Sequence, residues 1–212
     1  MAEVTMELIK VLREKTGAGV ALCKEALTAA NGDVENAITF IRKKDAGQAA
    51  KKAERATGQG VVLSKRSADN RVGAVIEVAC ETDFVAKNEM FRKMCDMMLD
   101  AFLAAKDVSN AGAIKLADGK TVLEAVQAAI ATIGENMKFR GCARLTAPEG
   151  GVVGIYTHFN QKAASLVALS LSGVKADSDA AKSVVSDVCM HITSCRPSGL
   201  KPEDLPADVI AR

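Results

Sequence analysis

Three residues near the end of the chain are of the types that bind metals or act as nucleophiles: Cys189, His191 and Cys195. The segment is predicted to be helical, and a helix turns by about 100° per residue, so only His191 and Cys195 share a face. Two ligands cannot complete a tetrahedral metal site. We therefore expect these side chains to pack in the core, and we expect neither a metal site nor a cofactor.

A second pattern that could do chemistry is Gly119-Lys120-Thr121, which matches the end of a phosphate-binding loop. The full pattern needs a glycine at the position of Ile114, and a strand before it. A turn followed by a helix that is capped by Thr121 and Glu124 explains the same residues. We therefore predict a turn and no nucleotide site.

A cysteine nucleophile is the remaining enzymatic alternative. Cys80 or Cys142 would have to act with His158, which is distant in the sequence. Neither cysteine has the basic neighbours that lower the pKa of a thiol, and no local hydrolase signature surrounds a histidine. We expect a protein that is not an enzyme, and a reactive cysteine of low pKa would contradict this.

An acidic and an aromatic side chain lie together where a predicted strand runs into a predicted helix. Either Thr82 or Asp83 can cap that helix. Phe84 follows in the first helical turn, where a large apolar side chain need not reach the core. Two interpretations stay open: Phe84 packs locally in a hydrophobic staple, or Asp83 and Phe84 form an exposed anchor of the kind that dominates protein interfaces.

The periodicity of apolar residues predicts the elements that position this corner. Residues 1–41 are predicted to form three short helices, with Thr5 and Asp33 as helix caps. Residues 42–59 are basic and polar and are predicted to form a partly helical linker. Residues 60–212 are predicted to form an α+β core, an antiparallel sheet with packed helices, and a short C-terminal tail.

Within this core, strands are predicted at 61–66, 72–80, 137–147, 152–159 and 165–171, and helices at 85–105, 122–134 and 178–194. The helix over 85–105 is expected to bury Met90, Met94, Met97, Met98 and Leu99.

Composition excludes several classes of function. Lys plus Arg is 28 and Asp plus Glu is 26, a net charge of +2, and aromatic residues are 3%, so we expect no direct contact with nucleic acid. The basic residues of 42–55 are interpreted as a solvated connector. The longest uncharged apolar stretch, 163–174, is shorter than the roughly 20 residues of a membrane-spanning helix. Six cysteines without a CxxC pair, and no targeting segment, predict a cytoplasmic protein.

Two segments carry a resemblance to a known family. Residues 82–86 read Thr-Asp-Phe-Val-Ala, and residues 12–27 contain a second signature. Four shorter motifs follow in the same order: Ala30-Asn31-Gly32-Asp33, Ile133-Gly134-Glu135-Asn136, Tyr156-Thr157-His158 and Lys201-Pro202-Glu203-Asp204. Over essentially its whole length the chain resembles the elongation factor Ts family, the guanine-nucleotide exchange factors of the GTPase elongation factor Tu.

The resemblance implies a ubiquitin-associated-like (UBA-like) N-terminal domain of three helices, followed by an α+β core. It also implies the residues that bind the partner. Thr82, Asp83, Phe84 and Val85 would enter the GTPase domain near its magnesium and phosphate site.

A second set of contacts is implied for the N-terminal module, through Leu12, Arg13, Val20 and Ala21. Val20 and Ala21 stand where many relatives have two methionines, so this contact is expected to be weaker or differently shaped. His158 would face the partner from the core. Because residues 159–163 replace a glycine-rich turn of the family, a structural role for His158 stays open as well.

The implied function is protein biosynthesis: the chain would bind elongation factor Tu with GDP and accelerate GDP release, so that GTP can rebind. A core shorter than that of longer relatives would complete its contacts by pairing with a second copy, so we expect a homodimer. The alternative is an adaptor without exchange activity, whose N-terminal module binds helical or ubiquitin-like partners. An adaptor has no need of the Asp83-Phe84 corner.

Overall fold

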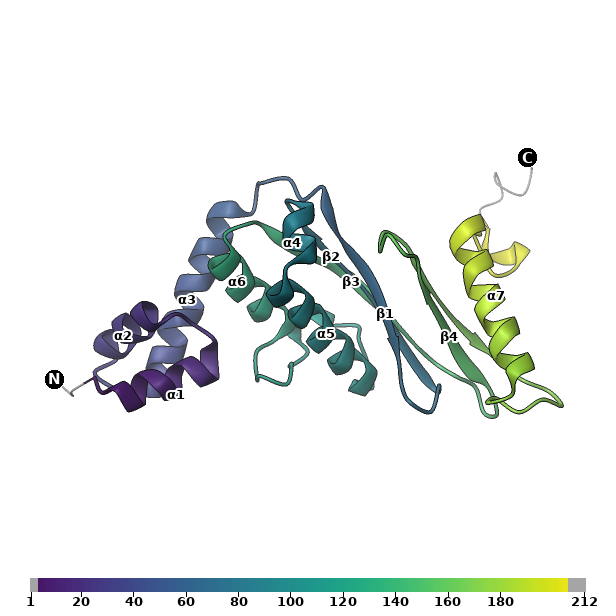
Figure 1. Cartoon of the computed structure of the whole chain (residues 1–212), viewed down its shortest axis with the longest axis horizontal. Helices are drawn as coiled ribbons and strands as arrows, with labels where there is room; N and C mark the ends of the chain where they lie inside the picture. The colour runs from purple at the N-terminus through teal and green to yellow at the C-terminus, as the bar shows by residue number, and fades with distance from the viewer. Residues whose placement is uncertain (1–3, 206–212) are drawn as a thin grey trace. The chain divides into compact units, whose positions relative to one another are not determined.

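The structure is a computed structural model that describes residues 4–205 (Figure 1). Its helices are α1 (Met6–Thr16), α2 (Val20–Ala29), α3 (Val34–Lys52), α4 (Asp83–Lys87), α5 (Glu89–Ala104), α6 (Val122–Ile133) and α7 (Asp179–Cys195), with short 3-10 turns η1 (Ala111–Ala113) and η2 (Pro202–Asp204). Its strands are β1 (Gln59–Arg66), β2 (Val72–Cys80), β3 (Met137–Thr146), β4 (Val152–Thr157) and β5 (Ala164–Leu169).

Two antiparallel sheets and packed helices confirm the predicted α+β class. One sheet has the strand order β1-β2-β3, and β4 pairs with β5 in the other. The chain divides into two compact units, one built from the residues up to Val61 together with Ile76–Cys142, the other from Val62–Val75 and the residues from Ala143 on. No helix of the described residues is long and apolar enough to cross a membrane.

The first three helices form around a small apolar core, and their predicted caps are confirmed. The hydroxyl of Thr5 accepts a hydrogen bond from the backbone N–H of Leu8 (3.3 Å), and the Asp33 carboxylate accepts one from Asn36 (2.7 Å). Gly17 ends α1 with a φ of 72°, a conformation that glycine adopts without strain. The buried side chains of this core are Ile9, Leu12, Cys23, Ala26, Leu27, Ala37 and Ile41.

Helix α3 extends well past the apolar stripe from which it was predicted. It runs to Lys52 and packs along α6, so the first part of the segment predicted as a linker is helical. Its charged side chains meet α6: Arg42 forms an ion pair with Glu124 (3.4 Å), and the Lys52 ammonium donates to the carbonyl of Ile130 (3.3 Å). The division into a module, a linker and a core stays a prediction.

The prediction of one continuous helix over 85–105 is wrong in one respect, because the helix is interrupted at Asn88. Asn88 has extended dihedral angles (φ −65°, ψ 135°), and its side chain accepts hydrogen bonds from the N–H groups of Met90 and Phe91. Asparagine is a good helix cap, so the short α4 and the longer α5 are separate. Met90 lies at the start of α5 and is 51% exposed, which corrects the prediction that it is buried. Met94, Met98 and Leu99 are buried as predicted, and Met97 is half-buried.

In the second unit, α7 packs on the β4–β5 hairpin. The helix comes so close to β4 that a Cβ on Gly154 would collide with the side chains of Val185 and Cys189. The hydroxyl of Ser165 on β5 donates to the carbonyl of Cys189 (2.7 Å). Gly154 therefore sets the distance between the helix and the hairpin.

We expect Gly154→Ala to lower the free energy of unfolding by about 1–3 kcal/mol, the usual cost of overpacking. Gly47→Ala is the matched control: a Cβ at this exposed helical position meets nothing within 4 Å, and alanine is expected to add about 0.5–1 kcal/mol. Urea denaturation measures both. Equal stability of Gly154→Ala and wild type would contradict the close approach of α7 to β4.

Candidate functional site

The corner between β2 and α4 presents an acid and an aromatic side chain to solvent. Thr82 caps α4, since its hydroxyl accepts the N–H of Val85 (3.3 Å). Phe84 is 81% exposed, although phenylalanine is an apolar residue that proteins usually bury. Because Phe84 lies on the surface, the hydrophobic staple interpretation is excluded. Val85, the next residue, is buried, so it anchors the corner in the protein.

Asp83 lies beside Phe84 and carries a full negative charge at neutral pH. The Lys87 ammonium donates a hydrogen bond to the Asp83 carboxylate at 2.9 Å, one helical turn away. This hydrogen bond and the positive charge of Lys87 lower the pKa of Asp83. Both side chains are solvated, so the ion pair contributes little free energy. Asp83 can therefore leave Lys87 and bind another positively charged group.

Glu135, at the turn between α6 and β3, holds the corner in place. Its carboxylate accepts one hydrogen bond from the backbone N–H of Thr82 (3.1 Å) and another from the Thr82 hydroxyl (2.9 Å). The thiol of Cys80 donates to the carbonyl of Thr82 (3.1 Å). Thr82, the cap of α4, is therefore hydrogen-bonded through its N–H, its carbonyl and its side chain, which makes the corner rigid.

Asn136, the next residue, ties the same corner to the segment after α3. Its side-chain amide donates to the carbonyls of Arg55 (2.7 Å) and Ala53 (3.3 Å), and its backbone N–H donates to the carboxylate of Glu81. Asn136 is buried, and all of these partners are needed to satisfy it. The motif Ile133–Asn136 was noticed in the sequence, but its contact with the corner was not predicted, because 53 residues separate Thr82 from Glu135.

Of the four residues singled out on the N-terminal module, three lie on its surface. Arg13, Val20 and Ala21 are exposed, whereas Leu12 has no exposed surface and belongs to the core of the module. Arg13 and Val20 border an open groove of about 660 Å³ that the apolar side chain of Met6 also lines. Its lining combines apolar side chains with two acids, Glu7 and Glu14, and two bases, Lys10 and Arg13, and an exposed groove that is partly apolar can bind another protein.

His158 lies at the end of β4 among aromatic side chains. The hydroxyl of Tyr156 is 3.1 Å from its Nδ1 atom, and its ring is 4.4 Å from that of Phe159 between centroids. Phe159 is 88% exposed. Both roles of His158 stay open, because it is fixed by Tyr156 and also borders an exposed aromatic surface.

The three candidate metal ligands of α7 separate as helical geometry requires. Cys189 is buried as expected. His191 and Cys195 are exposed, with their Nε2 and Sγ atoms 3.4 Å apart, which corrects the prediction that they pack in the core. Among residues 4–205, no three His, Cys, Asp or Glu side chains are grouped so that they could hold a metal ion.

Burial keeps most of the thiols protonated. It raises the pKa of Cys23, Cys142 and Cys189, and that of Cys95 to about 12. Only the thiolate is nucleophilic. Cys142 is therefore poorly suited to act as a catalytic nucleophile.

We expect a thiol reagent such as dithionitrobenzoate to modify one cysteine of the native protein rapidly, the exposed Cys195. Cys142, which is half-buried, should react slowly, and the buried cysteines only after unfolding. The fast phase should disappear in Cys195→Ser. Fast labelling of Cys80 or Cys142 would instead favour the enzymatic alternative.

Comparison with known proteins identifies a family with the same motifs. A family model described as elongation factor TS matches residues 81–212. The chain is 39% identical over 214 residues to elongation factor Ts of Nautilia profundicola, an alignment that covers 100% of this chain and 69% of the relative. It is 40% identical over 214 residues to that of Sodalis glossinidius and 38% identical over 216 residues to that of Yersinia pestis, in each case over 100% of this chain and 68% of the relative.

Proposed function

We propose that this chain, which belongs to the elongation factor Ts family, binds elongation factor Tu in its GDP-bound state and accelerates the release of GDP. Family membership gives it a role in translation elongation. One observation carries the finer proposal: Phe84, 81% exposed, lies beside the ionised Asp83 on a corner that Glu135 holds rigid. An exposed aromatic side chain on a preorganised corner loses little entropy when it enters a pocket of a partner.

The proposed mechanism is displacement of the magnesium and phosphate site of the GTPase. Phe84 fills an apolar pocket between helices of the partner and moves one of them aside. Asp83 brings a negative charge toward the magnesium shell, where it competes for water ligands or repels other acidic groups. Without magnesium, the β-phosphate of GDP loses its main counter-charge, and GDP dissociates.

Exchange by this route requires no covalent step, and no residue of the chain acts as an acid, base or nucleophile. The two binding events oppose each other. A conformation of the partner that binds this chain tightly binds GDP weakly, and the factor is the same in both directions. GTP then rebinds and releases the chain.

This reciprocity gives the test of the proposal. The affinity of the chain for purified elongation factor Tu, measured by fluorescence anisotropy, should fall as GDP is added, and the affinity for GDP should fall by the same factor when the chain is added. Equal affinity for the GDP-bound and nucleotide-free forms would contradict an exchange function. An adaptor would show such an equality.

The N-terminal module supplies a second contact through Arg13, Val20 and Ala21. Leu12 supports this surface from inside the module. We expect Val20→Asp to weaken binding to elongation factor Tu by about tenfold, because it replaces an exposed apolar contact of the groove with a charge. The maximal rate of GDP release at saturating protein should change little, because the corner is untouched. A lower maximal rate with unchanged affinity would contradict this division of roles.

Self-association and compartment are part of the same proposal. We expect a homodimer. Two apolar side chains on α7, Val184 and Met190, are exposed and could contribute to its interface. Sedimentation equilibrium tests it, and a monomer at all concentrations would contradict it. We expect the chain to act in the cytoplasm, without nucleic acid, membrane or cofactor.

A further inference from the structure

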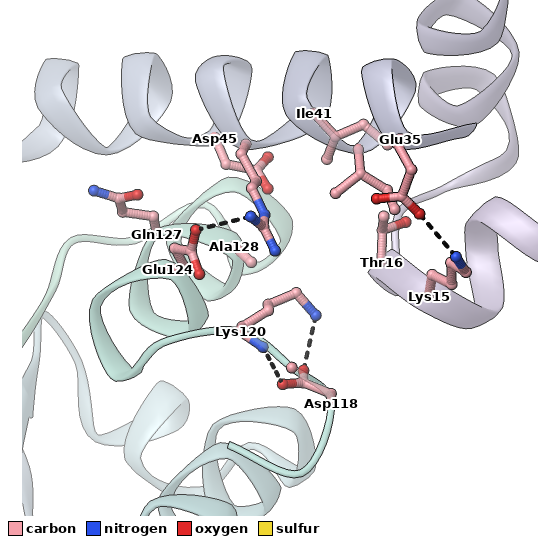
Figure 2. Close-up of a pocket in the computed structure, with 13 residues that line it drawn as sticks. Lys15, Thr16, Glu35, Ile41, Asp45, Asp118, Lys120, Glu124, Gln127 and Ala128 are labelled. Atoms are coloured by element: carbon pink, nitrogen blue, oxygen red, sulfur yellow. Dashed lines mark hydrogen bonds and ion pairs between the residues drawn. The ribbon is translucent and has the colours of Figure 1, made fainter. Parts of the chain in front are cut away.

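A cavity of about 290 Å³ lies between α3, α6 and the turn that carries Asp118 and Lys120 (Figure 2). Its lining is apolar at Ile38 and Ile41 on α3 and at Ala128 on α6. The other lining groups are mostly charged. The cavity therefore combines an apolar wall with ionic groups, as sites for small amphipathic molecules do.

The charges around the cavity form three pairs. Lys15 binds Glu35 (3.0 Å), Arg42 lies 3.4 Å from Glu124, and Lys120 binds Asp118 (2.8 Å). Every cation that lines the cavity has a carboxylate partner. The pairs neutralise one another and leave no net charge for a ligand to meet.

Asp45 is the fourth carboxylate of the lining, and it has no cation of the lining as its ion-pair partner. It is 9% exposed, and its carboxylate points from α3 into the cavity (Figure 2). Among residues 4–205 it forms no hydrogen bond and no ion pair within 4 Å, although Lys120 and Lys44 act on it at longer range. Burial raises the pKa of Asp45. A carboxylate that is largely withdrawn from solvent and has no close cationic partner is destabilising, and one excess negative charge remains in the cavity.

We propose that this cavity binds a linear alkyl diamine, with one ammonium group on the Asp45 carboxylate. The alkyl chain would lie along Ile38, Ile41 and Ala128, and the second ammonium would share the carboxylate of Asp118 with Lys120, which is already paired with it. An anion does not fit, because the cavity is already negative. A metal ion does not fit either, since the described residues provide no group of three ligands.

A bound diamine would join α3 to the turn before α6, so it should stabilise the native protein. Isothermal calorimetry and thermal unfolding of the full chain with butane-1,4-diamine test the site at constant ionic strength. We expect saturable binding and a rise in melting temperature. Binding should weaken as the pH falls through the pKa of Asp45, because a protonated carboxyl no longer offsets an ammonium charge. Glu35, Asp118 and Glu124 face the same cavity, each in an ion pair with a cation, and comparison with Asp45→Asn isolates the part of this dependence that belongs to Asp45.

Asp45→Asn should reduce the affinity for the diamine at least about tenfold. It should also melt no lower than wild type, because it removes a buried charge. Asp177→Asn, which changes an exposed carboxylate in the second unit, is the matched control and should bind the diamine as wild type does.

Two probes with a single ammonium identify the ligand class. If butylamine binds as tightly as the diamine, the second ammonium is not recognised and the diamine assignment is overturned. If acetyl-lysine methylamide binds as tightly, the assignment is overturned in favour of a lysine side chain of a protein. Absence of binding to wild type, or equal binding to Asp45→Asn, would overturn the site.

Discussion

Phe84→Ala should reduce the acceleration of GDP release from elongation factor Tu by about thirty-fold, which corresponds to about 2 kcal/mol for a central interface residue. The free energy of unfolding should change by less than about 0.5 kcal/mol, because Phe84 is exposed and contributes little to the core. Stopped-flow fluorescence of a labelled GDP measures the first quantity, and urea denaturation measures the second. The two measurements separate a binding role from a structural one.

The control for this variant is Leu123→Ala, which removes another exposed apolar side chain from the same unit. It should leave GDP release unchanged. If Phe84→Ala lost stability by several kcal/mol and its exchange defect followed the loss of folded protein, the anchor role of Phe84 would be refuted. Equal defects in both variants would point to a general loss of apolar surface.

The second large effect is expected from Glu135→Ala, at a residue that is not part of the exposed anchor. The substitution removes the carboxylate that accepts hydrogen bonds from the backbone N–H and the hydroxyl of the half-buried Thr82. We expect a loss of about 1–3 kcal/mol of stability and a fall of about tenfold in the acceleration of GDP release, since Asp83 and Phe84 are then no longer preorganised.

Glu135→Gln separates positioning from simple destabilisation. Glutamine keeps one acceptor oxygen of the same reach, so it should bind only one of the two donors of Thr82 and give an intermediate rate. Exchange is compared at a temperature where both variants are folded by circular dichroism. A normal rate in Glu135→Ala would show that the corner does not depend on Glu135.

Local signals in the sequence predicted much of the fold. Thr5, Asp33 and Thr121 were identified as caps from residue type and spacing, and all three accept the expected hydrogen bonds. A helix cap is a contact between residues about three positions apart, so the local sequence is enough to predict it. The sequence left open whether Phe84 packs locally or forms an exposed anchor; the structure shows that Phe84 is exposed, and its role as an anchor stays a proposal.

Contacts between distant segments account for what the sequence did not predict. Residues 42–59 were predicted to form a partly helical linker, but the packing of the helical part on α6, with partners such as Glu124, was not predicted. Asp45 was not predicted as buried, because an aspartate in a basic segment reads as a solvated residue. Glu135 could not be assigned to the corner, since no local pattern reports a pairing over 53 residues.

The most direct test of the central claim is the rate of release of labelled GDP from elongation factor Tu as the concentration of this chain increases. Wild type should accelerate release with saturation, and the Asp83→Ala/Phe84→Ala variant, folded and equally stable, should not accelerate it measurably. No acceleration by folded wild-type protein, or undiminished acceleration by the double variant, would contradict the proposal that this corner drives nucleotide exchange.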